Sequence, residues 1–540
     1  MNRSSYKSLS LFAFPVILFA AGILYLVITG PYFLQSVDPE YSYLLNGLLI
    51  ADLKLHLSFI FHPGTPVQCI AAILIRIVHI FRPGYTVVQD VMLNPELYIK
   101  AILYTIIAMN AVALYLMGLR VYKSSLNISV ALFLQLTPFT HVLTLEVLRR
   151  LMPEPLMNMI VCGWISLIMG LIYTDPMKLN LKRYALLFGL LSGISLADKL
   201  TMLPFIIIPL ILLRGWRYKL MYVLSSTGSF LLFAFPVTIK INSFYSWVKD
   251  IFMHTGSYGT GEKGIIKWNE FTDHLKLQFE STGMLKLVLL ILFLVTVIYF
   301  LRKRRSRTFS HIKCRTGFAL VLVIALEYLF ASKHFAFHYM IPALLLTATG
   351  SLMVILMLDD LLPAGLKPTV LKGILTLAGI TIMAYTTPRL ITHMKQIRQI
   401  TETNTSAFKR IEPLLKRTPK IISASYYGCA SIEYALTCGI HVSGKYSSYL
   451  TGNLNELYPL SYLYLPWGKV FYQGNRILNP SDFIKPDANY NLYVADFSKK
   501  LLDQILNAFR SDFPHDHINI REMYVDSIQH EGVFLVRLTD

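Results

Sequence analysis

Charged side chains are scarce in this chain, at 15% of its 540 residues, whereas hydrophobic residues make up 54%. This balance, with a mean hydropathy of +0.52, excludes an ordinary soluble domain and indicates a polytopic membrane protein. Cysteine is rare as well, and none of the five cysteines forms a Cys-x-x-Cys pair of the kind that holds a metal ion. Cys429 and Cys438 could be bridged in an extracytoplasmic domain, but two buried thiols is the interpretation we favour.

Acidic residues are outnumbered by basic ones, 31 to 50, so the formal net charge is +19. The densest basic cluster runs from Arg302 to Arg305 and continues with Arg307, Lys313 and Arg315. It lies between two apolar segments and contains no pattern of interleaved aromatics, which is typical of a cytoplasmic loop under the positive-inside rule. The excess of positive charge therefore does not indicate a nucleic-acid partner.

Apolar runs long enough, or nearly long enough, to cross a bilayer recur along the first 390 residues, about eleven in all. They are residues 11–30, 97–118, 126–145, 155–173, 185–198, 201–213, 220–240, 284–301, 316–332, 339–358 and 369–388. The first run is expected to remain as an uncleaved helix, since no small-residue cleavage site closes it. A cytoplasmic N-terminus puts the basic loops inside, and an odd number of crossings puts the tail outside.

The expected fold is thus mostly α: a polytopic membrane helix bundle with a small C-terminal α/β domain. Residues 1–390 would form the bundle, with long outer loops at 31–96 and 241–283, and residues 391–540 the extracytoplasmic domain. In the tail, residues 420–425, 491–495 and 532–536 read as strands and residues 430–437 as a helix. In the first loop, the apolar spacing over 44–56 suits a helix lying in the membrane interface.

A glycine-rich segment, residues 254–264, lies in the second long loop. Four glycines in nine residues predict a mobile loop whose backbone can approach a neighbour closely. The segment is not a P-loop, because no strand precedes it and no Gly-Lys-Ser/Thr follows it.

Ionisable residues gather at the outer ends of the predicted helices. They are Asp38 and Glu40 after the first run, Glu146, Arg149, Arg150 and Glu154 after the third, Asp198 and Lys199 after the fifth, and Lys333, His334 and His338 after the ninth. Each one alone fits a snorkelling interfacial side chain, and Asp38 alone fits a helix N-cap with Pro39 at the first helical position. Together they suit a cavity for a phosphorylated, lipid-linked substrate.

The order of these short motifs resembles that of the GT-C membrane glycosyltransferases, in the branch that holds the protein O-mannosyltransferases and the lipid A aminoarabinose transferases (glycosyltransferase families 39 and 83). The matching segments are Asp38-Pro39-Glu40-Tyr41, His62-Pro63-Gly64-Thr65-Pro66, Arg149-Arg150-Leu151-Met152-Pro153-Glu154-Pro155, Ala197-Asp198-Lys199-Leu200-Thr201 and His338-Tyr339-Met340-Ile341-Pro342. The resemblance covers roughly residues 10–390, and the tail matches in position and class.

The resemblance implies a polyprenyl-phosphate-sugar donor, an extracytoplasmic acceptor and inversion at the anomeric carbon, in a multi-pass protein of what we expect to be a bacterial plasma membrane. The acceptor could be a lipid, a glycan or a protein. The implied catalytic acids are Asp38, Glu40 and Glu154, with Asp38 at the family's base position; the groups for the donor phosphate are Lys199, Arg149, Arg150 and His338; the substrate loops contribute His62, His254 and Tyr258.

This chain has Asp-x-Glu where the family has adjacent acids, which leaves open which acid is the base. The residues also leave open whether a divalent metal takes part, and Asp38 and Glu154 are the acids that would hold one.

Two other classes of function compete with the glycosyltransferase. A transporter or flippase for a lipid-linked sugar would place ionisable residues in mid-membrane and show paired repeats, whereas here they cluster at helix ends and no repeat is visible. A structural scaffold with an outer domain leaves the shared sidedness of the acidic and basic loops unexplained.

Topology supplies the first test, because every role above depends on it. We expect cysteines introduced near residues 45 and 450 to react with a membrane-impermeant reagent on intact cells, and cysteines introduced between Arg302 and Arg315 to be protected. Protection of both outer positions would overturn the assignment.

Overall fold

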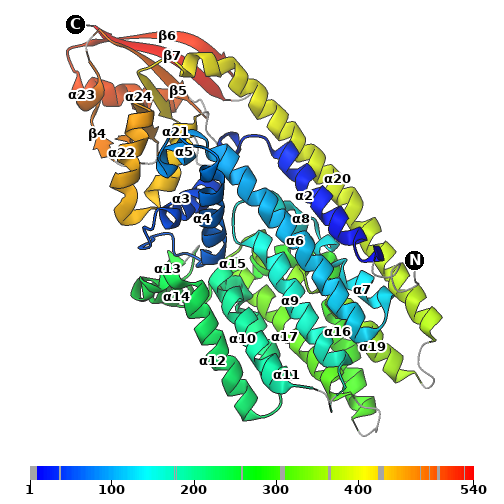
Figure 1. Cartoon of the computed structure of the whole chain (residues 1–540). Coiled ribbons are helices and arrows are strands. Elements are labelled where there is room, and N and C mark those ends of the chain that lie inside the picture. Colours follow the sequence, from blue (N-terminus) through cyan, green and yellow to red (C-terminus); the bar gives the residue numbers. More distant parts are fainter. Residues whose placement is uncertain are drawn as a thin grey trace. The chain divides into compact units, whose positions relative to one another are not determined.

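The computed structural model describes residues 9–35, 38–175, 177, 179–256, 259–304, 310–362, 367–423, 431–466, 468–474, 476–485, 487–495, 499–527 and 530–539 (Figure 1). It divides into two compact units. Unit 1 comprises residues 1–25, 60–67 and 103–393, and unit 2 comprises residues 26–59, 68–102 and 394–540. Four helices pass from one unit to the other: α2 (Ala13–Thr29), α4 (Thr65–Ile80), α6 (Pro95–Ser125) and α20 (Pro368–Leu415).

The regular elements of unit 1 are all helices in its described residues, apart from one isolated β-bridge between His254 and Lys263. Its further helices are α7 (Ile128–Leu134), α8 (Val142–Glu146), α9 (Glu154–Tyr173), α10 (Leu181–Asp198), α11 (Ile207–Leu212), α12 (Trp216–Phe233), α13 (Phe235–Thr238), α14 (Ile241–Met253), α15 (Trp268–Ser281), α16 (Gly283–Lys303), α17 (His311–Lys333), α18 (Ile341–Leu344) and α19 (Thr347–Leu361). Short 3-10 helices join them: η2 (Thr137–Phe139), η3 (Val147–Arg149), η5 (Leu200–Ile206) and η7 (Phe337–Met340).

Several helices are long and apolar enough to cross a membrane, which confirms the expected class. Within the described residues six qualify by length and composition: Pro95–Ser125, Glu154–Tyr173, Gly283–Lys303, His311–Lys333, Phe337–Leu361 and Pro368–Leu415. Ala13–Thr29, Thr65–Ile80 and Leu200–Leu212 are shorter apolar helices. The figure of about eleven crossings stays a prediction.

The apolar run at 126–145 is not one continuous helix. It is divided into α7, η2 and α8, and Pro138 lies in the first turn of η2. Proline has no N–H to donate and clashes with the preceding turn, which favours a break here. Pro388 lies inside the continuous helix α20, so a proline alone does not decide where a helix ends. The apolar run therefore predicts the extent of this segment but not the points at which its helices end.

Helices α10 and α12 lie side by side in unit 1 and touch through small residues (Figure 1). A Cβ atom at Gly189 would lie 2.4 Å from the Cβ of Ser225, and one at Gly193 would lie 2.4 Å from the Cβ of Ser229. The two serine hydroxyls donate to backbone carbonyls of α10, at 3.0 and 2.8 Å. Small residues with interhelical hydrogen bonds are the usual means of close helix contact in membranes.

Unit 2 contains a seven-stranded mixed sheet of order β4-β3-β2-β1-β5-β7-β6. Its strands are β1 (Lys420–Ser423), β2 (Ser461–Leu465), β3 (Val470–Gln473), β4 (Arg476–Leu478), β5 (Asn489–Val494), β6 (His517–Asp526) and β7 (Glu531–Thr539), and its tail helices are α21 (Ile432–His441), α22 (Ser447–Leu457), α23 (Pro480–Phe483) and α24 (Lys499–Asp512), with η8 (Gly444–Tyr446). β1 pairs in parallel with β2 and β5, and the other pairs are antiparallel. The strands and the helix expected in the tail are confirmed.

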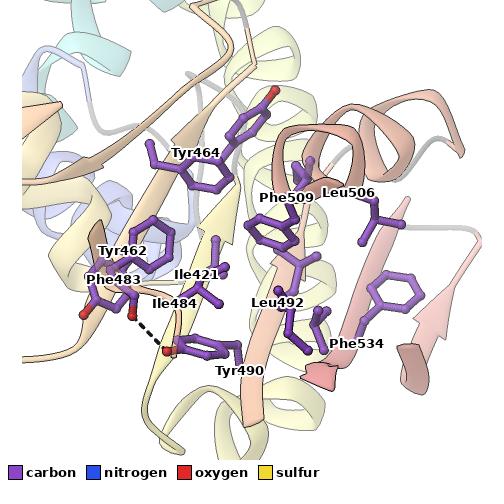
Figure 2. Packing of buried hydrophobic residues seen from close by; sticks show 14 of the residues in the cluster. Ile421, Tyr462, Tyr464, Phe483, Ile484, Tyr490, Leu492, Leu506, Phe509 and Phe534 are labelled. Atoms are coloured by element: carbon purple, nitrogen blue, oxygen red, sulfur yellow. Dashed lines mark hydrogen bonds between the residues drawn. The ribbon is translucent and has the colours of Figure 1, made fainter. Parts of the chain in front are cut away.

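One face of this sheet packs against α24 (Figure 2). Ile421, Leu492 and Phe534 project from adjacent strands toward Leu506 and Phe509 of the helix. These residues alternate along the strands with others that point to the opposite face, which is the period of two expected for a strand. The side chains of β1 and β5 are buried on both faces, as in a sheet covered on both sides.

The first loop of the sequence belongs to unit 2 and contains η1 (Tyr32–Leu34), α3 (Glu40–Ala51) and α5 (Val87–Leu93). The helix predicted over 44–56 is present as α3, but it has no exposed polar face, because every residue from Glu40 to Leu49 is buried. A Cβ atom at Gly47 would lie 2.7 Å from the Cβ of Ala71, and one at Gly439 would lie 2.6 Å from the carbonyl of Tyr41. Helix α3 therefore packs closely on both α4 and α21.

Helix α4, which the sequence did not reveal, has the exposed apolar stripe instead. Ile73, Ile77 and Ile80 are 60%, 47% and 73% exposed, and their spacing puts them on one side of the helix. An apolar stripe of this kind favours an interfacial position for α4 rather than for α3. Because Leu45 is fully buried, Leu53, which is 82% exposed, is the better position for a labelling cysteine in this loop.

Glu96, in the first turn of α6, holds the segment before α3. Its carboxylate accepts hydrogen bonds from the backbone N–H groups of Tyr32 (2.9 Å) and Phe33 (3.2 Å) and from the hydroxyl of Tyr41 (2.9 Å). Three donors from two neighbouring elements thus converge on one half-buried acid. The acid fixes both ends of the short stretch that contains Asp38.

Replacing Glu96 with alanine should lower the free energy of unfolding by about 2–4 kcal/mol, because three buried donors lose a charged acceptor. Glu96→Gln keeps one acceptor oxygen and should cost less, and Tyr41→Phe, which removes one donor, should cost about 1 kcal/mol. Thermal unfolding of the purified proteins in detergent would rank the stabilities of the three variants. Equal stability of Glu96→Ala and the unmodified protein would contradict this role.

Candidate active site

The Asp198–Lys199 motif lies where α10 stops. Asp198 is the last residue of the helix, and Lys199 is the C-cap with an extended backbone, φ −157° and ψ 139°. The carbonyl of Asp198 accepts a hydrogen bond from the N–H of Gly64 at 3.1 Å. Two of the predicted motifs, His62–Pro66 and Ala197–Thr201, are thus joined through the backbone.

Lys199 forms a buried ion pair with Glu154, the first residue of α9. The two side chains are 5% and 1% exposed. His338, from η7, places its Nε2 3.6 Å from the Oε1 of Glu154, and its side chain is 42% exposed. Three residues predicted from separate motifs therefore meet within unit 1, and the histidine connects the buried pair to the surface.

Asp198 lies beside this pair and adds a second carboxyl group. Its side chain is fully buried, and neither carboxylate oxygen has a hydrogen-bond partner among the described residues. The Oε2 of Glu154 has none either. Buried acceptors normally have partners, so these oxygens mark a site with more acceptors than donors.

Aromatic residues line the same cluster. The Nζ of Lys199 lies 4.9 Å from the centre of the Tyr339 ring, which is within cation–π range. The Tyr339 hydroxyl lies 3.3 Å from the Nε2 of His62, whose ring centre is 5.2 Å from that of Trp247. Burial, and next the positive charge of Lys199, hold the pKa of His62 well below its usual range. His62 is therefore a neutral imidazole at physiological pH.

Arg149 belongs to a different polar group of unit 1. Its Nη2 lies 3.0 Å from the Oε1 of Glu146, and the other oxygen of Glu146 lies 3.4 Å from the Nε2 of His393. The Nδ1 of His393 lies 3.1 Å from the Tyr25 hydroxyl. Arg150 is half-buried and is the C-cap of η3. Arg149 thus has Glu146 as an acidic partner.

The glycine-rich loop is closed on itself by backbone hydrogen bonds, and it lies against the end of α17. Backbone bonds join Thr255 to Glu262 and Met253 to Gly264, each at 2.9 Å, and a Cβ atom at Gly259 would lie 2.5 Å from the backbone of Asp250. This confirms the predicted close approach of its backbone. His254 lies in this loop with its Nδ1 3.5 Å from Asp250, whereas Tyr258 lies outside the described residues.

Lys333 and His334 hold this loop against the end of α17. The Nζ of Lys333 donates to the carbonyls of Ile251 and Phe252, both at 2.6 Å. The ring of His334 lies 2.8 Å from the carbonyls of Ile251 and Gly256. Their role is to position the loop.

Asp38 and Glu40 belong to unit 2, at the start of α3. The helix begins at Glu40 and its N-cap is Pro39, with no side-chain cap bond, so Asp38 is not the capping residue. Asp38 instead lines a cavity of about 310 Å³ together with residues of the tail. Cys438 also lines it and is a free thiol, whereas Cys429 lies outside the described residues.

A metal centre has no support in the side chains that are described. No group of three or more His, Cys, Asp or Glu residues is gathered among them in a way that could hold a metal ion. We therefore derive no chemical step through a metal.

Several residues of these clusters were not predicted as functional from sequence. Trp247 carries no signal beyond being aromatic, and Tyr339 lies in the motif that begins at His338 but was given no role of its own. The tail residues that share a cavity with Asp38 are about four hundred positions away from it along the chain. Glu96 could have been suspected, since an acid just after Pro95 at a helix start is well placed to accept bonds from a neighbouring loop.

Comparison with known proteins gives a likeness in fold. The sequence matches no protein-family model and no curated protein. The fold is similar to that of ArnT from Cupriavidus metallidurans: the apo structure matches with a TM-score of 0.50 and 9% identity, over 96% of this chain and 97% of that chain. The structure of ArnT bound to undecaprenyl phosphate matches with a TM-score of 0.48 and 11% identity over the same shares. At this identity the likeness shows the fold alone, and the expected resemblance in fold is confirmed to that extent.

Breaking the Lys199–Glu154 pair should be costly in unit 1. Lys199→Met leaves Glu154 buried without its cation, which should destabilise the protein by about 3–5 kcal/mol. Adding Glu154→Gln removes the uncompensated charge and should restore most of the stability. The matched control is Lys416→Met, which breaks an exposed ion pair with Glu412; the two side chains are 73% and 38% exposed, respectively. This change should lower the free energy of unfolding by less than about 1 kcal/mol. Thermal unfolding in detergent measures all three, and a double variant no more stable than Lys199→Met would contradict the account.

Proposed function

We propose that this chain is an integral-membrane glycosyltransferase. It moves a sugar from a polyprenyl-phosphate donor to an extracytoplasmic acceptor, with inversion at the anomeric carbon. The observation that carries the proposal is the meeting of Lys199, Glu154 and His338, because it sets a cation inside an apolar bundle and links it to the surface through a half-exposed histidine. The likeness in fold to ArnT agrees with it.

The proposed reaction is a single displacement. The acceptor oxygen attacks the anomeric carbon on the face opposite the phosphate, the bond from that carbon to the phosphate oxygen breaks, and the lipid phosphate leaves with the electron pair. Cations near the leaving oxygen stabilise the charge that develops there, which in a partly dry site is worth several kcal/mol. Lys199 is the principal candidate, and Arg150 and His338 are the next.

Glu154 has a positioning role in this scheme. Its Oε1 holds the Lys199 ammonium, and the stacked Tyr339 ring limits where that ammonium can move. An ammonium fixed in advance costs little reorganisation when charge develops, which is the main source of electrostatic catalysis.

The proton of the acceptor hydroxyl must pass to a base within hydrogen-bond reach. We propose Asp38 for this role. It lies in the segment anchored by Glu96, it does not cap α3, and it lines a cavity. Glu40 is the second candidate; it is fully buried in the first turn of α3.

The function can be tested by mass spectrometry of envelope glycans and polyprenyl-phosphate sugars from cells with and without this protein. Loss of the protein should remove one sugar from the envelope and let its lipid-phosphate donor accumulate. Loss of the same envelope sugar with its lipid-linked form trapped on the cytoplasmic face would instead identify a transporter, and an unchanged set of envelope and lipid-linked sugars would contradict both functions.

Asp38→Asn gives the sharpest test of the base. The amide is nearly isosteric and keeps an oxygen that can accept a hydrogen bond, so the protein should stay folded, while the transfer rate falls about a hundredfold or more because the acceptor hydroxyl loses its proton acceptor. Binding of the donor should be unchanged, since a base acts on the transition state.

Glu40→Gln is the matched control, and it should be milder if Glu40 is not the base. Wild-type transfer by folded Asp38→Asn would exclude Asp38 from this role.

A further inference from the structure

The cavity beside Asp38 lies entirely within unit 2. It has a volume of about 310 Å³ and lies between α21 and the strands β2 and β3, with the start of α3 as one wall. Its strand residues, Leu463, Leu465 and Tyr472, alternate with the residues that pack on α24. The cavity is therefore on the opposite face of the sheet from the core in Figure 2.

Uncharged hydrogen-bonding groups surround the cavity. Ser42, Thr437, His441 and Tyr472 line it together with Asp38. The Thr437 hydroxyl donates to the carbonyl of Glu433 at 2.9 Å, so its oxygen can still accept a bond from a ligand. A few polar groups on a mostly apolar wall are the usual make-up of a small-molecule site, and the volume is at the lower end of about 300–1,000 Å³.

The charge of the cavity selects against anions. Asp38 is its one acid, and the described residues that line it include no lysine or arginine. Burial lowers the pKa of His441, which keeps the ring neutral at physiological pH. Burial, and next the charge of Asp38, raise the pKa of the Cys438 thiol to about 12. A phosphate placed here would face a carboxylate and no cation, so the donor phosphate does not belong in this cavity.

Aromatic surface completes the site. The His441 and Tyr472 rings are 5.5 Å apart between centres and nearly perpendicular, at 88°. Val442 and Leu463 add apolar surface. A pyranose or furanose ring presents hydroxyls around its edge and C–H groups on its faces, and both kinds of group find partners on these walls.

We propose that this cavity binds a neutral sugar ring, the group that carries the acceptor hydroxyl. That the bound sugar is the acceptor rests on the proposed function. That the cavity binds a neutral sugar rests on the cavity alone. It gives the tail domain a specific task, since α21 and β3 would contact the ring while Asp38 accepts the proton from its hydroxyl.

Direct binding tests the proposal without any transfer activity. The full chain in lipid nanodiscs would be titrated with methyl glycosides of neutral hexoses and pentoses and with glucose 6-phosphate, observed by saturation-transfer NMR. We expect at least one methyl glycoside to bind and the sugar phosphate to bind more weakly. His441→Phe and Tyr472→Phe each remove polar atoms but keep a ring, and each should weaken glycoside binding by about three- to tenfold.

Two variants outside the cavity are the controls. His515→Phe and Tyr449→Phe change the same residue types at exposed positions of unit 2 and should leave glycoside binding unchanged. Absence of glycoside binding, tighter binding of the sugar phosphate, or unchanged binding in both folded cavity variants would overturn the proposal.

The outcomes separate this proposal from the proposed function. Glycoside binding that both cavity variants weaken, in a protein that transfers no sugar, would support the sugar site and reject the transferase. Sugar transfer with an acceptor KM unaffected by His441→Phe and Tyr472→Phe would keep the transferase and reject the sugar site.

Discussion

The burial of charge inside an apolar bundle constrains unit 1 more than any other interaction. Glu154, Asp198 and Lys199 are almost completely buried, and an uncompensated ion there would cost several kcal/mol. Lys199 and Glu154 can compensate each other's charge only if the end of α10 and the start of α9 meet at one point. Two further contacts lie at the same point, where α10 ends at Lys199. The N–H of Gly64 donates to the carbonyl of Asp198, and the ring of Tyr339 lies next to the Lys199 ammonium.

The two units differ in the kind of group each can stabilise. The cluster of unit 1 contains a buried ammonium and suits a negatively charged group that forms during a reaction. The cavity of unit 2 contains one carboxylate among hydroxyls and aromatic rings and suits an uncharged group with a proton to give. A transfer reaction needs both kinds of environment, because charge leaves with one product while a proton leaves the other.

Local sequence signals predicted apolar helices of unit 1, three of the seven described tail strands and the position of Lys199 at a helix end, because apolar runs, strand alternation and helix stops depend on near neighbours. They did not reveal α4. They did not predict the break at Pro138 or the buried position of α3, since both depend on packing partners. The cavity beside Asp38 could not be predicted from local sequence at all. Asp38, Thr437 and Tyr472 come from three distant segments, and only the fold brings them to one wall.

Helix α12 has little protein around it. Of its eighteen residues only Tyr222 and Ser229 are buried, while Leu224 and Leu232 are 64% and 68% exposed. The glycine–serine contacts with α10 cover one narrow edge, and leucines exposed to this extent need an apolar medium on the other sides. The apolar run 220–240 is one of the predicted crossings; on that prediction lipid is a packing partner for α12, and a detergent that strips it would remove part of the support for α10, the helix whose last residue is Asp198.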